Sequence, residues 1–262
     1  SVIVRASMHA GMHSFMHDDL LGPSMRHPRS MAIASIALGS IGVIISAVLG
    51  VFLAPDVNPS QWRAPEAYRI IFLHVPFAWT SFLAFTVLFF GSLGWYLRRS
   101  ESSWRLVQTG SDLGLLFGFG VITSGPIWGM AEWGVPWDWA DLRLNTFALL
   151  TAVALFIVMA RRSQFDDDTT RDTIASVGLF GFMLVPITAV ATTLYQKRHP
   201  GIVIVESENS GLDPVIRTIL LSGFISMTFL FIGFAMLSND LYAKEADLEK
   251  ELKKLDLAEE VS

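Results

Sequence analysis

The sequence predicts an all-α, polytopic integral membrane protein with six transmembrane helices and both termini in the cytoplasm. Apolar residues make up 52% of the 262 residues and charged residues only 16%, and the mean hydropathy is +0.48. Soluble domains carry more polar surface than this. Six apolar runs are long enough to cross a bilayer as helices, which needs about 20 residues. Basic residues gather at alternate ends of these runs, which sets the orientation.

The six predicted spans differ in length, and the fourth is the shortest. They cover residues 31–54, 70–97, 106–130, 144–160, 174–195 and 214–238. None shows the alternating pattern of a barrel strand, so we interpret them as helices. The expected domains are an N-terminal arm over 1–30, a six-helix domain over 31–238 and a C-terminal helix or tail over 239–262. Within the six-helix domain we expect an outward tryptophan-rich loop over 128–144.

Lysine and arginine residues orient the predicted spans. Thirteen of the 19 lie in the N-terminal arm, the loops 98–105 and 161–173, and the tail after residue 238. The other six lie in or beside the loops 55–69, 131–143 and 196–213. Because positive residues favour the cytoplasmic side of a membrane, the first set is expected there. The tryptophan-rich loop then faces outward.

Composition and motifs exclude several classes of protein. The absence of cysteine rules out disulfides, thiolate metal sites and covalent c-type heme attachment to this chain. A net charge of −5 with no basic stretch gives no sign of nucleic-acid binding. No nucleotide-binding loop and no hydrolase motif is present. In the arm, a Met-His pair recurs at residues 8–9, 12–13 and 16–17, which fits either a soft-metal site or a solvated segment.

Four of the eight tryptophans fall within twelve residues. A single tryptophan near a membrane surface is usually an interfacial anchor. Four together, with charged residues at their edge, offer a flat aromatic surface suited to a large planar ligand with acidic substituents, such as a porphyrin. The tryptophans are Trp128, Trp133, Trp137 and Trp139, and the charged residues are Asp138, Asp141 and Arg143.

Two histidines are expected on the same side of the membrane as this loop. His74 lies near the outward end of the second span, and His199 lies in the third outward loop. Imidazole is a common axial ligand of heme iron, and two such ligands would leave the iron six-coordinate. A hydrogen-bonded or solvated histidine at a helix end is the alternative. Arg69 and Arg143 are the candidate partners of the porphyrin carboxylates, although Arg143 can equally pair with Asp138 or Asp141.

Four segments carry a resemblance to a known family. They are Leu73–Trp79, Thr123–Gly129, Trp133–Leu144 and Gly211–Pro214, the last followed by Arg217. They resemble the heme-handling cytochrome c biogenesis proteins with a tryptophan-rich WWD motif, and among them most closely heme exporter protein C, or CcmC. The larger relatives CcmF and CcsA normally have more helices and additional histidines. One departure is Ala140, which separates Trp139 from Asp141, so either Asp138 or Asp141 takes the place of the family's aspartate.

The resemblance implies a function in cytochrome c maturation at the inner (cytoplasmic) membrane. The chain would bind heme b on the outer side and hand it to the heme chaperone CcmE, with the ABC transporter subunits CcmA and CcmB, and CcmD, as further partners. His74 and His199 would be the axial ligands, the four tryptophans would pack on the porphyrin, and Asp141 and Arg143 would lie at its edge. Whether the chain assists covalent attachment of heme to the chaperone is left open.

Two other classes of function compete with this interpretation. A b-type heme electron-transfer subunit would place histidine pairs within facing helices. A small-molecule transporter would show charges within the spans or helices broken at mid-membrane.

Overall fold

A computed structural model describes residues 23–60, 62–164, 166–195 and 213–260, and these ranges contain helices and no strand. The elements are α2 (Pro23–Phe52), the 3₁₀-helix η1 (Pro65–Ile70), α3 (Ile71–Arg98), α4 (Glu101–Trp133), α5 (Leu142–Ser163), α6 (Asp168–Phe182), α7 (Leu184–Tyr195) and α8 (Pro214–Glu260). Six candidate membrane spans are present in the described chain, with α6 and most of α7 forming one of them. The predicted all-α fold with six spans is confirmed. The Met-His repeat of the arm lies outside the described residues.

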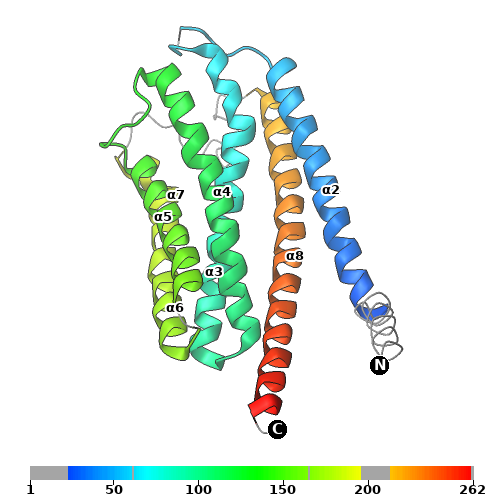
Figure 1. Ribbon diagram of the computed structural model, residues 1–262. Helices are drawn as coiled ribbons and strands as arrows, with labels where there is room; N and C mark the ends of the chain where they lie inside the picture. The colour runs from blue at the N-terminus through cyan, green and yellow to red at the C-terminus, as the bar shows by residue number, and fades with distance from the viewer. Residues whose placement is uncertain (1–22, 61, 165, 196–212, 261–262) are drawn as a thin grey trace, which may run out of the picture.

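The helices stand side by side in one bundle (Figure 1). The antiparallel pair α3 and α4 forms its centre, α5, α6 and α7 pack on one side, and α2 and α8 pack together on the other. The start of α2 and the end of α8 lie at the same end of the bundle, and the turn from α4 to α5 lies at the opposite end.

Close packing of α3 and α4 depends on a glycine at their contact. A Cβ atom at Gly110 would lie 2.5 Å from the backbone nitrogen of Leu88, so only glycine allows the two backbones to approach this closely. Lipid tails are as apolar as leucine side chains, and membrane helices therefore associate largely through such tight van der Waals contact. The α3–α4 pair is consequently a rigid support for residues at both of its ends.

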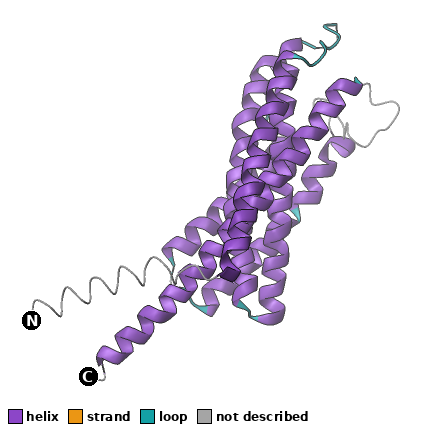
Figure 2. Ribbon diagram, turned by 90° about the vertical axis from the view of Figure 1, so that its right-hand side faces the viewer, coloured by secondary structure: helices purple, strands orange, loops and turns teal. Residues whose placement is uncertain are grey.

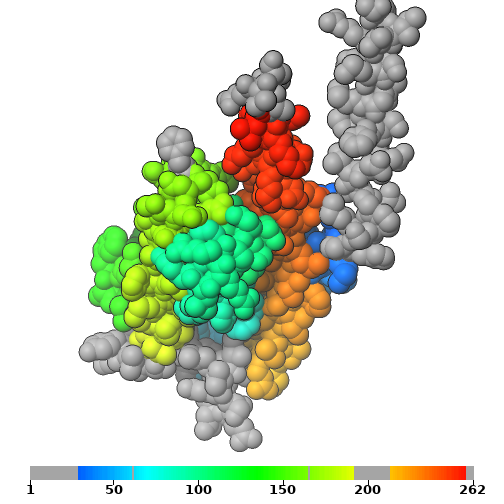
Figure 3. All heavy atoms as spheres, turned by 90° about the horizontal axis from the view of Figure 1, so that it is seen from below, coloured from blue at the N-terminus to red at the C-terminus, as the bar shows by residue number. Residues whose placement is uncertain are grey.

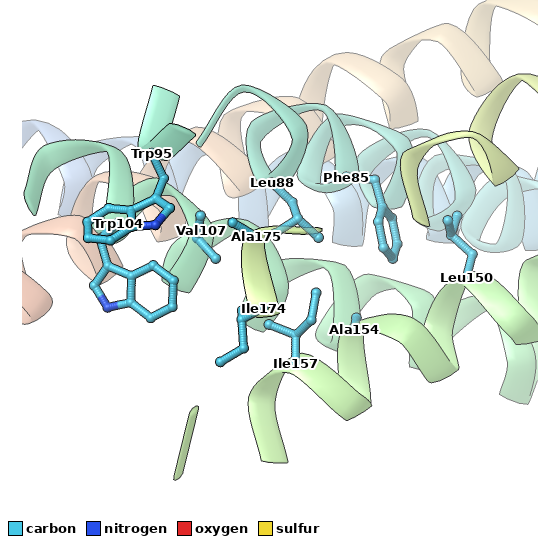
Figure 4. Packing of buried hydrophobic residues seen from close by; sticks show 10 residues of the cluster. All are labelled: Phe85, Leu88, Trp95, Trp104, Val107, Leu150, Ala154, Ile157, Ile174 and Ala175. Atoms are coloured by element: carbon cyan, nitrogen blue, oxygen red, sulfur yellow. The ribbon is translucent and has the colours of Figure 1, made fainter. Parts of the chain in front are cut away.

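A hydrophobic core joins α3, α4, α5 and α6 (Figure 4). Aliphatic side chains such as Leu88 and Ile157 fill its centre. At the end near the α3–α4 turn, Trp95 and Trp104 pack with ring centroids 5.7 Å apart, and the guanidinium of Arg171 lies 5.2 and 5.0 Å from the two rings. This tryptophan pair therefore serves the fold and is separate from the tryptophan cluster that the sequence singled out.

The predicted span over 174–195 is broken at Met183. The backbone N–H of Met183 bonds to the carbonyl of Phe180, three residues earlier, and a new helix starts at Leu184. Pro186 explains the break, because proline lacks the N–H that would bond to the carbonyl of Phe182 and its ring crowds the preceding turn. Where the regular helical hydrogen bond is missing, the chain makes a tighter turn with a bond to the carbonyl three residues earlier.

Helix α8 continues well past its predicted span, through Glu260. Its continuation is tied to the bundle by Tyr242, which donates a hydrogen bond to Asp112, and by the ion pair of Arg29 with Asp240 at 2.8 Å. Beyond these contacts the last turns project from the bundle (Figure 2). The helical tail predicted from its leucine spacing is present, and its leucines are exposed.

Candidate functional site

His74 lies in the first turn of α3, where α3, α4 and α5 come together. Its Nδ1 is 2.8 Å from the hydroxyl oxygen of Ser124 on α4. A Cβ atom built at Gly125 would lie 3.4 Å from His74 Cε1 and 3.9 Å from a methyl group of Leu144 on α5. The half-buried imidazole thus stands against a small residue of α4 and next to the first turn of α5.

Two of the four clustered tryptophans belong to a helix. Helix α4 runs through Trp133 and ends at Gly134, whose φ of 77° is a left-handed conformation that glycine adopts without strain. The rings of Trp128 and Trp133 are in edge-to-face contact, with centroids 4.8 Å apart. The segment expected as a loop over 128–144 is therefore non-helical only over 134–141.

The other two tryptophans lie on this short loop. Trp137 donates from Nε1 to the side-chain oxygen of Asn145 at 3.2 Å, and its ring centroid is 5.8 Å from that of Trp139. The side-chain nitrogen of Asn145 donates to the carbonyls of Trp139 and Asp141, both at 2.8 Å. Trp139 is 83% exposed. Asn145, which the sequence analysis did not single out, thus fixes the loop to α5 and holds an aromatic ring outward.

Asp141 is the N-cap of α5. Its carboxylate accepts the backbone N–H of Leu144 at 2.8 Å, and the residue is only 3% exposed. Asp138 instead accepts the backbone N–H of Ala140 at 2.9 Å within the loop. An aspartate three residues before the bonded N–H is a preferred cap, because it satisfies a donor that the helix leaves unpaired. The three-residue spacing from Asp141 to Leu144 therefore allows Asp141 to cap α5.

Arg143 follows this cap in the first turn of α5 and is half-buried. No salt bridge joins it to Asp138 or Asp141 among the described residues. Positive charge at this position adds to the positive end of the helix dipole. The start of α5 therefore combines the positive charge of Arg143 with the carboxylate of Asp141, and the two interact electrostatically.

Arg69 has a structural role at the end of α2. Its Nη1 donates to the carbonyls of Gly50, Val51 and Ala54 at 3.1, 3.0 and 2.9 Å, and its Nη2 pairs with Asp56 at 2.8 Å. These carbonyls belong to the last turn of α2 and the residues after it, which lack partners within the helix. The guanidinium thus closes the end of α2, and its contact with a ligand carboxylate stays a prediction.

Arg63 is a cationic residue that the sequence analysis did not single out. It is exposed, and its guanidinium lies against Gly134, where an added Cβ would come within 2.2 Å of Nη1. Glu132 holds its backbone in place, since the carboxylate accepts the N–H groups of Arg63 and Ala64 at 3.1 and 2.9 Å. The only sequence signal was the position of Arg63 in the same outward loop as Arg69.

The structure brings together one histidine, four tryptophans and Arg143 at one end of the bundle. His199 lies outside the described residues, so this prediction stays untested. Two cavities among the described residues lie elsewhere: one of about 400 Å³ beside Trp79 on α3 and α8, and one of about 650 Å³ at the opposite end, near Asp112 and Arg161. Figure 3 views that opposite end, where the α3–α4 turn lies between α6 and α8.

These residues are chemically suited to hold heme. The imidazole of His74 can donate a nitrogen lone pair to iron, the aromatic rings can cover apolar porphyrin surface, and Arg143 and Arg63 can face carboxylates at the porphyrin edge. The exposed ring of Trp139 offers a contact surface without enclosing a ligand.

The chain is similar to known proteins over most of its length. The model of the family described as heme exporter protein C matches residues 23–253. Heme exporter protein C of Bradyrhizobium diazoefficiens is 28% identical over 202 residues, which are 77% of this chain and 73% of that protein. The protein of the same name from Escherichia coli K12 is 28% identical over 216 residues, 80% of this chain and 78% of that protein. A Marchantia polymorpha protein described as cytochrome c biosynthesis ccmC-like and mitochondrial is 25% identical over 231 residues, 88% of this chain and 93% of its own length.

Proposed function

Because the chain belongs to the heme exporter protein C (CcmC) family, we propose that it binds heme b between His74 and the tryptophan cluster and delivers it to the heme chaperone CcmE. The family membership itself assigns the chain to heme handling in cytochrome c maturation. The observation that carries the finer proposal is the convergence of His74, Arg143 and four tryptophans at one end of the bundle.

Each residue has a distinct task in this proposal. His74 ligates the iron on one face, and His199, predicted from the sequence, ligates it on the other. The rings of Trp128, Trp133, Trp137 and Trp139 contact the porphyrin, and burial of apolar area contributes about 25 cal/mol per Å². Arg143 binds a propionate at the positive end of α5, and Asp141 acts by holding the first turn of α5 in place rather than by touching heme.

We also propose a membrane orientation for the chain. We place the heme-binding end on the outer face of the inner membrane and both termini in the cytoplasm, as the distribution of lysine and arginine favours. The ABC transporter subunits CcmA and CcmB, with CcmD, are the proposed partners. No nucleotide-binding motif occurs in this chain, so ATP would be used by partner subunits.

The two competing functions receive little support. His74 lies in the first turn of α3 rather than midway along a span, where a b-type heme subunit holds its ligands. The break at Met183 is a feature that transporters use, but no charged residue occurs over 173–195. Asp112 has Arg161 as its ion-pair partner at 2.5 Å, at the end of the bundle opposite His74.

An absorption spectrum of the purified full-length protein tests the proposal. We expect a heme spectrum with six-coordinate iron, and transfer of that heme to added CcmE. His74→Ala and His199→Ala should each weaken heme retention, and added imidazole should restore part of the spectrum by filling the vacated position.

The tryptophans need a matched control. Trp139→Ala should lower heme content per protein and transfer to CcmE. Trp79→Ala removes a half-exposed tryptophan on the same helix as His74 but outside the cluster, and it should leave both unchanged. Unaltered spectra in both histidine variants, or equal heme loss in the two tryptophan variants, would overturn the proposed site. Heme that CcmE cannot remove would instead favour an electron-transfer subunit.

A further inference from the structure

The hydroxyl group of Ser124 has three polar neighbours but only one proton to donate. It is 2.6 Å from the carbonyl oxygen of Gly120, 3.3 Å from that of Val121, and 2.8 Å from Nδ1 of His74. A hydroxyl carries one proton and two lone pairs, whereas a carbonyl oxygen can only accept. The close contact with Gly120 therefore takes the proton of Ser124, and the serine oxygen must accept a hydrogen bond from Nδ1–H of His74.

We propose that Ser124 is a positioning residue that holds His74 in the Nδ1–H tautomer and thereby directs the Nε2 lone pair to the heme iron. The inference rests on the proposed function, since it takes His74 as an iron ligand. In a neutral imidazole, protonation of one nitrogen leaves the lone pair on the other, so the partner of Nδ1 decides which nitrogen can ligate. A histidine ligand usually donates its second N–H to such a partner, which fixes the ring and raises its basicity.

The surroundings of Ser124 suit this task. Its hydroxyl is anchored to its own helix, at the carbonyl four residues earlier, so the acceptor oxygen has a fixed position. Gly125 follows, and a Cβ built there would lie 3.4 Å from Cε1 of His74, an ordinary van der Waals contact, so the imidazole stands directly beside α4. A serine that bonds back to its helix is common and needs no ligand to explain it. The contact with His74 is the additional feature, and it is the one that an experiment must isolate.

Thr123 provides a matched control. Its hydroxyl bonds back to carbonyls of its own helix, those of Phe119 and Gly120 at 2.8 and 3.2 Å, as the Ser124 hydroxyl also bonds back to α4. Thr123 is exposed, however, and among the described residues it has no hydrogen bond to His74. We expect Ser124→Ala to weaken heme affinity by about 10- to 100-fold, the usual effect of removing a partner of a metal ligand. Thr123→Ala should leave affinity unchanged, and Ser124→Thr, which keeps a hydroxyl, should retain most of it.

The reduction potential gives a readout that a purely structural role would not move. A hydrogen bond from Nδ1–H makes the imidazole a stronger electron donor and stabilises ferric iron, so Ser124→Ala should raise the potential of the heme that remains bound. Thr123→Ala and Ser124→Thr should keep the potential of the unsubstituted protein.

The tautomer itself can be tested by ligand rescue. In His74→Gly, imidazole can ligate iron and still donate an N–H to Ser124, whereas 1-methylimidazole and pyridine can ligate but have no N–H. We expect imidazole to restore the six-coordinate spectrum at lower concentration than either, after correction for their affinities for free heme. That preference should disappear in the double variant His74→Gly/Ser124→Ala. Pyridine carries no added methyl group, so agreement between the two ligands excludes bulk as the cause.

The outcomes separate this inference from the proposed function. If His74→Ala leaves heme binding and its spectrum unchanged, the proposed ligand is wrong. If His74→Ala removes the ligand but Ser124→Ala matches the unsubstituted protein in affinity, potential and rescue preference, then His74 is a ligand and Ser124 does not position it. Equal effects of Ser124→Ala and Thr123→Ala would likewise overturn the inference, because both would then act through α4.

Discussion

Replacement of Asp141 tests whether the aspartate of the tryptophan-rich motif acts as a helix cap. The buried carboxylate accepts the N–H of Leu144 at 2.8 Å and thereby fixes the first turn of α5, which carries Arg143. Loss of an N-cap in Asp141→Ala costs about 1 kcal/mol and up to about 2. A change of that size alters the equilibrium between ordered and disordered states by roughly 5- to 30-fold.

Asparagine separates the cap from the charge. Asparagine and aspartate are about equally good caps, so Asp141→Asn should keep the first turn of α5 while removing the negative charge. Asp138→Ala, which removes the acceptor of the Ala140 N–H within the loop, should change stability by less than about 0.5 kcal/mol. We therefore expect large effects of Asp141→Ala and small effects of the other two variants.

Three measurements on each variant report the local order of the first turn of α5, the stability of the whole protein and its heme content. Hydrogen exchange followed by mass spectrometry over residues 138–147 should show faster exchange in Asp141→Ala alone, together with a lower apparent Tm and a lower heme content per protein. If Asp141→Asn is as damaging as Asp141→Ala, the negative charge and not the cap is what matters. If Asp138→Ala is the damaging change, Asp138 takes the place of the family's aspartate and the capping argument fails.

Three further predictions concern topology, a buried ion pair and helix packing. Reporter fusions should report the cytoplasm at residues 100, 166 and 250 and the outside at 60, 137 and 205; a cytoplasmic signal at 137 would invert the proposed orientation. Asp112→Asn should destabilise by about 3 kcal/mol, because it leaves the nearly buried Arg161 without its carboxylate. Asp56→Asn, which changes an exposed carboxylate, should cost under about 1 kcal/mol, and similar shifts in apparent Tm for the two variants would contradict this difference. Gly110→Ala should destabilise the protein by about 1–3 kcal/mol, because the added Cβ clashes with the backbone of α3. In Gly125→Ala the nearest contact of the added Cβ is 3.4 Å, so this variant should unfold at nearly the temperature of the unsubstituted protein. The reverse order of stability would refute the packing argument.

The architecture was predictable because its signals are local. Whether a segment spans a membrane depends on the number of consecutive apolar residues, which is a property of that segment alone. The six spans and the helical tail after residue 238 followed from such patterns. The exact helix ends did not, since α4 continues through Trp133 and the span over 174–195 breaks at Met183. Pro186 indicates that break in the sequence, but the unbroken run of apolar residues predicted one continuous helix.

The sequence by itself determined which residue types were available for the site, and only the tertiary structure decided their tasks. Arg69 and Arg143 look equivalent along the chain, yet one closes the end of α2 and the other stands at the start of α5. Ser124 lies 50 residues from His74, so nothing in the local pattern links them. A hydrogen bond depends on distances of about 3 Å between atoms of different helices. Such distances are set by how the helices pack, and packing is a property of the whole bundle.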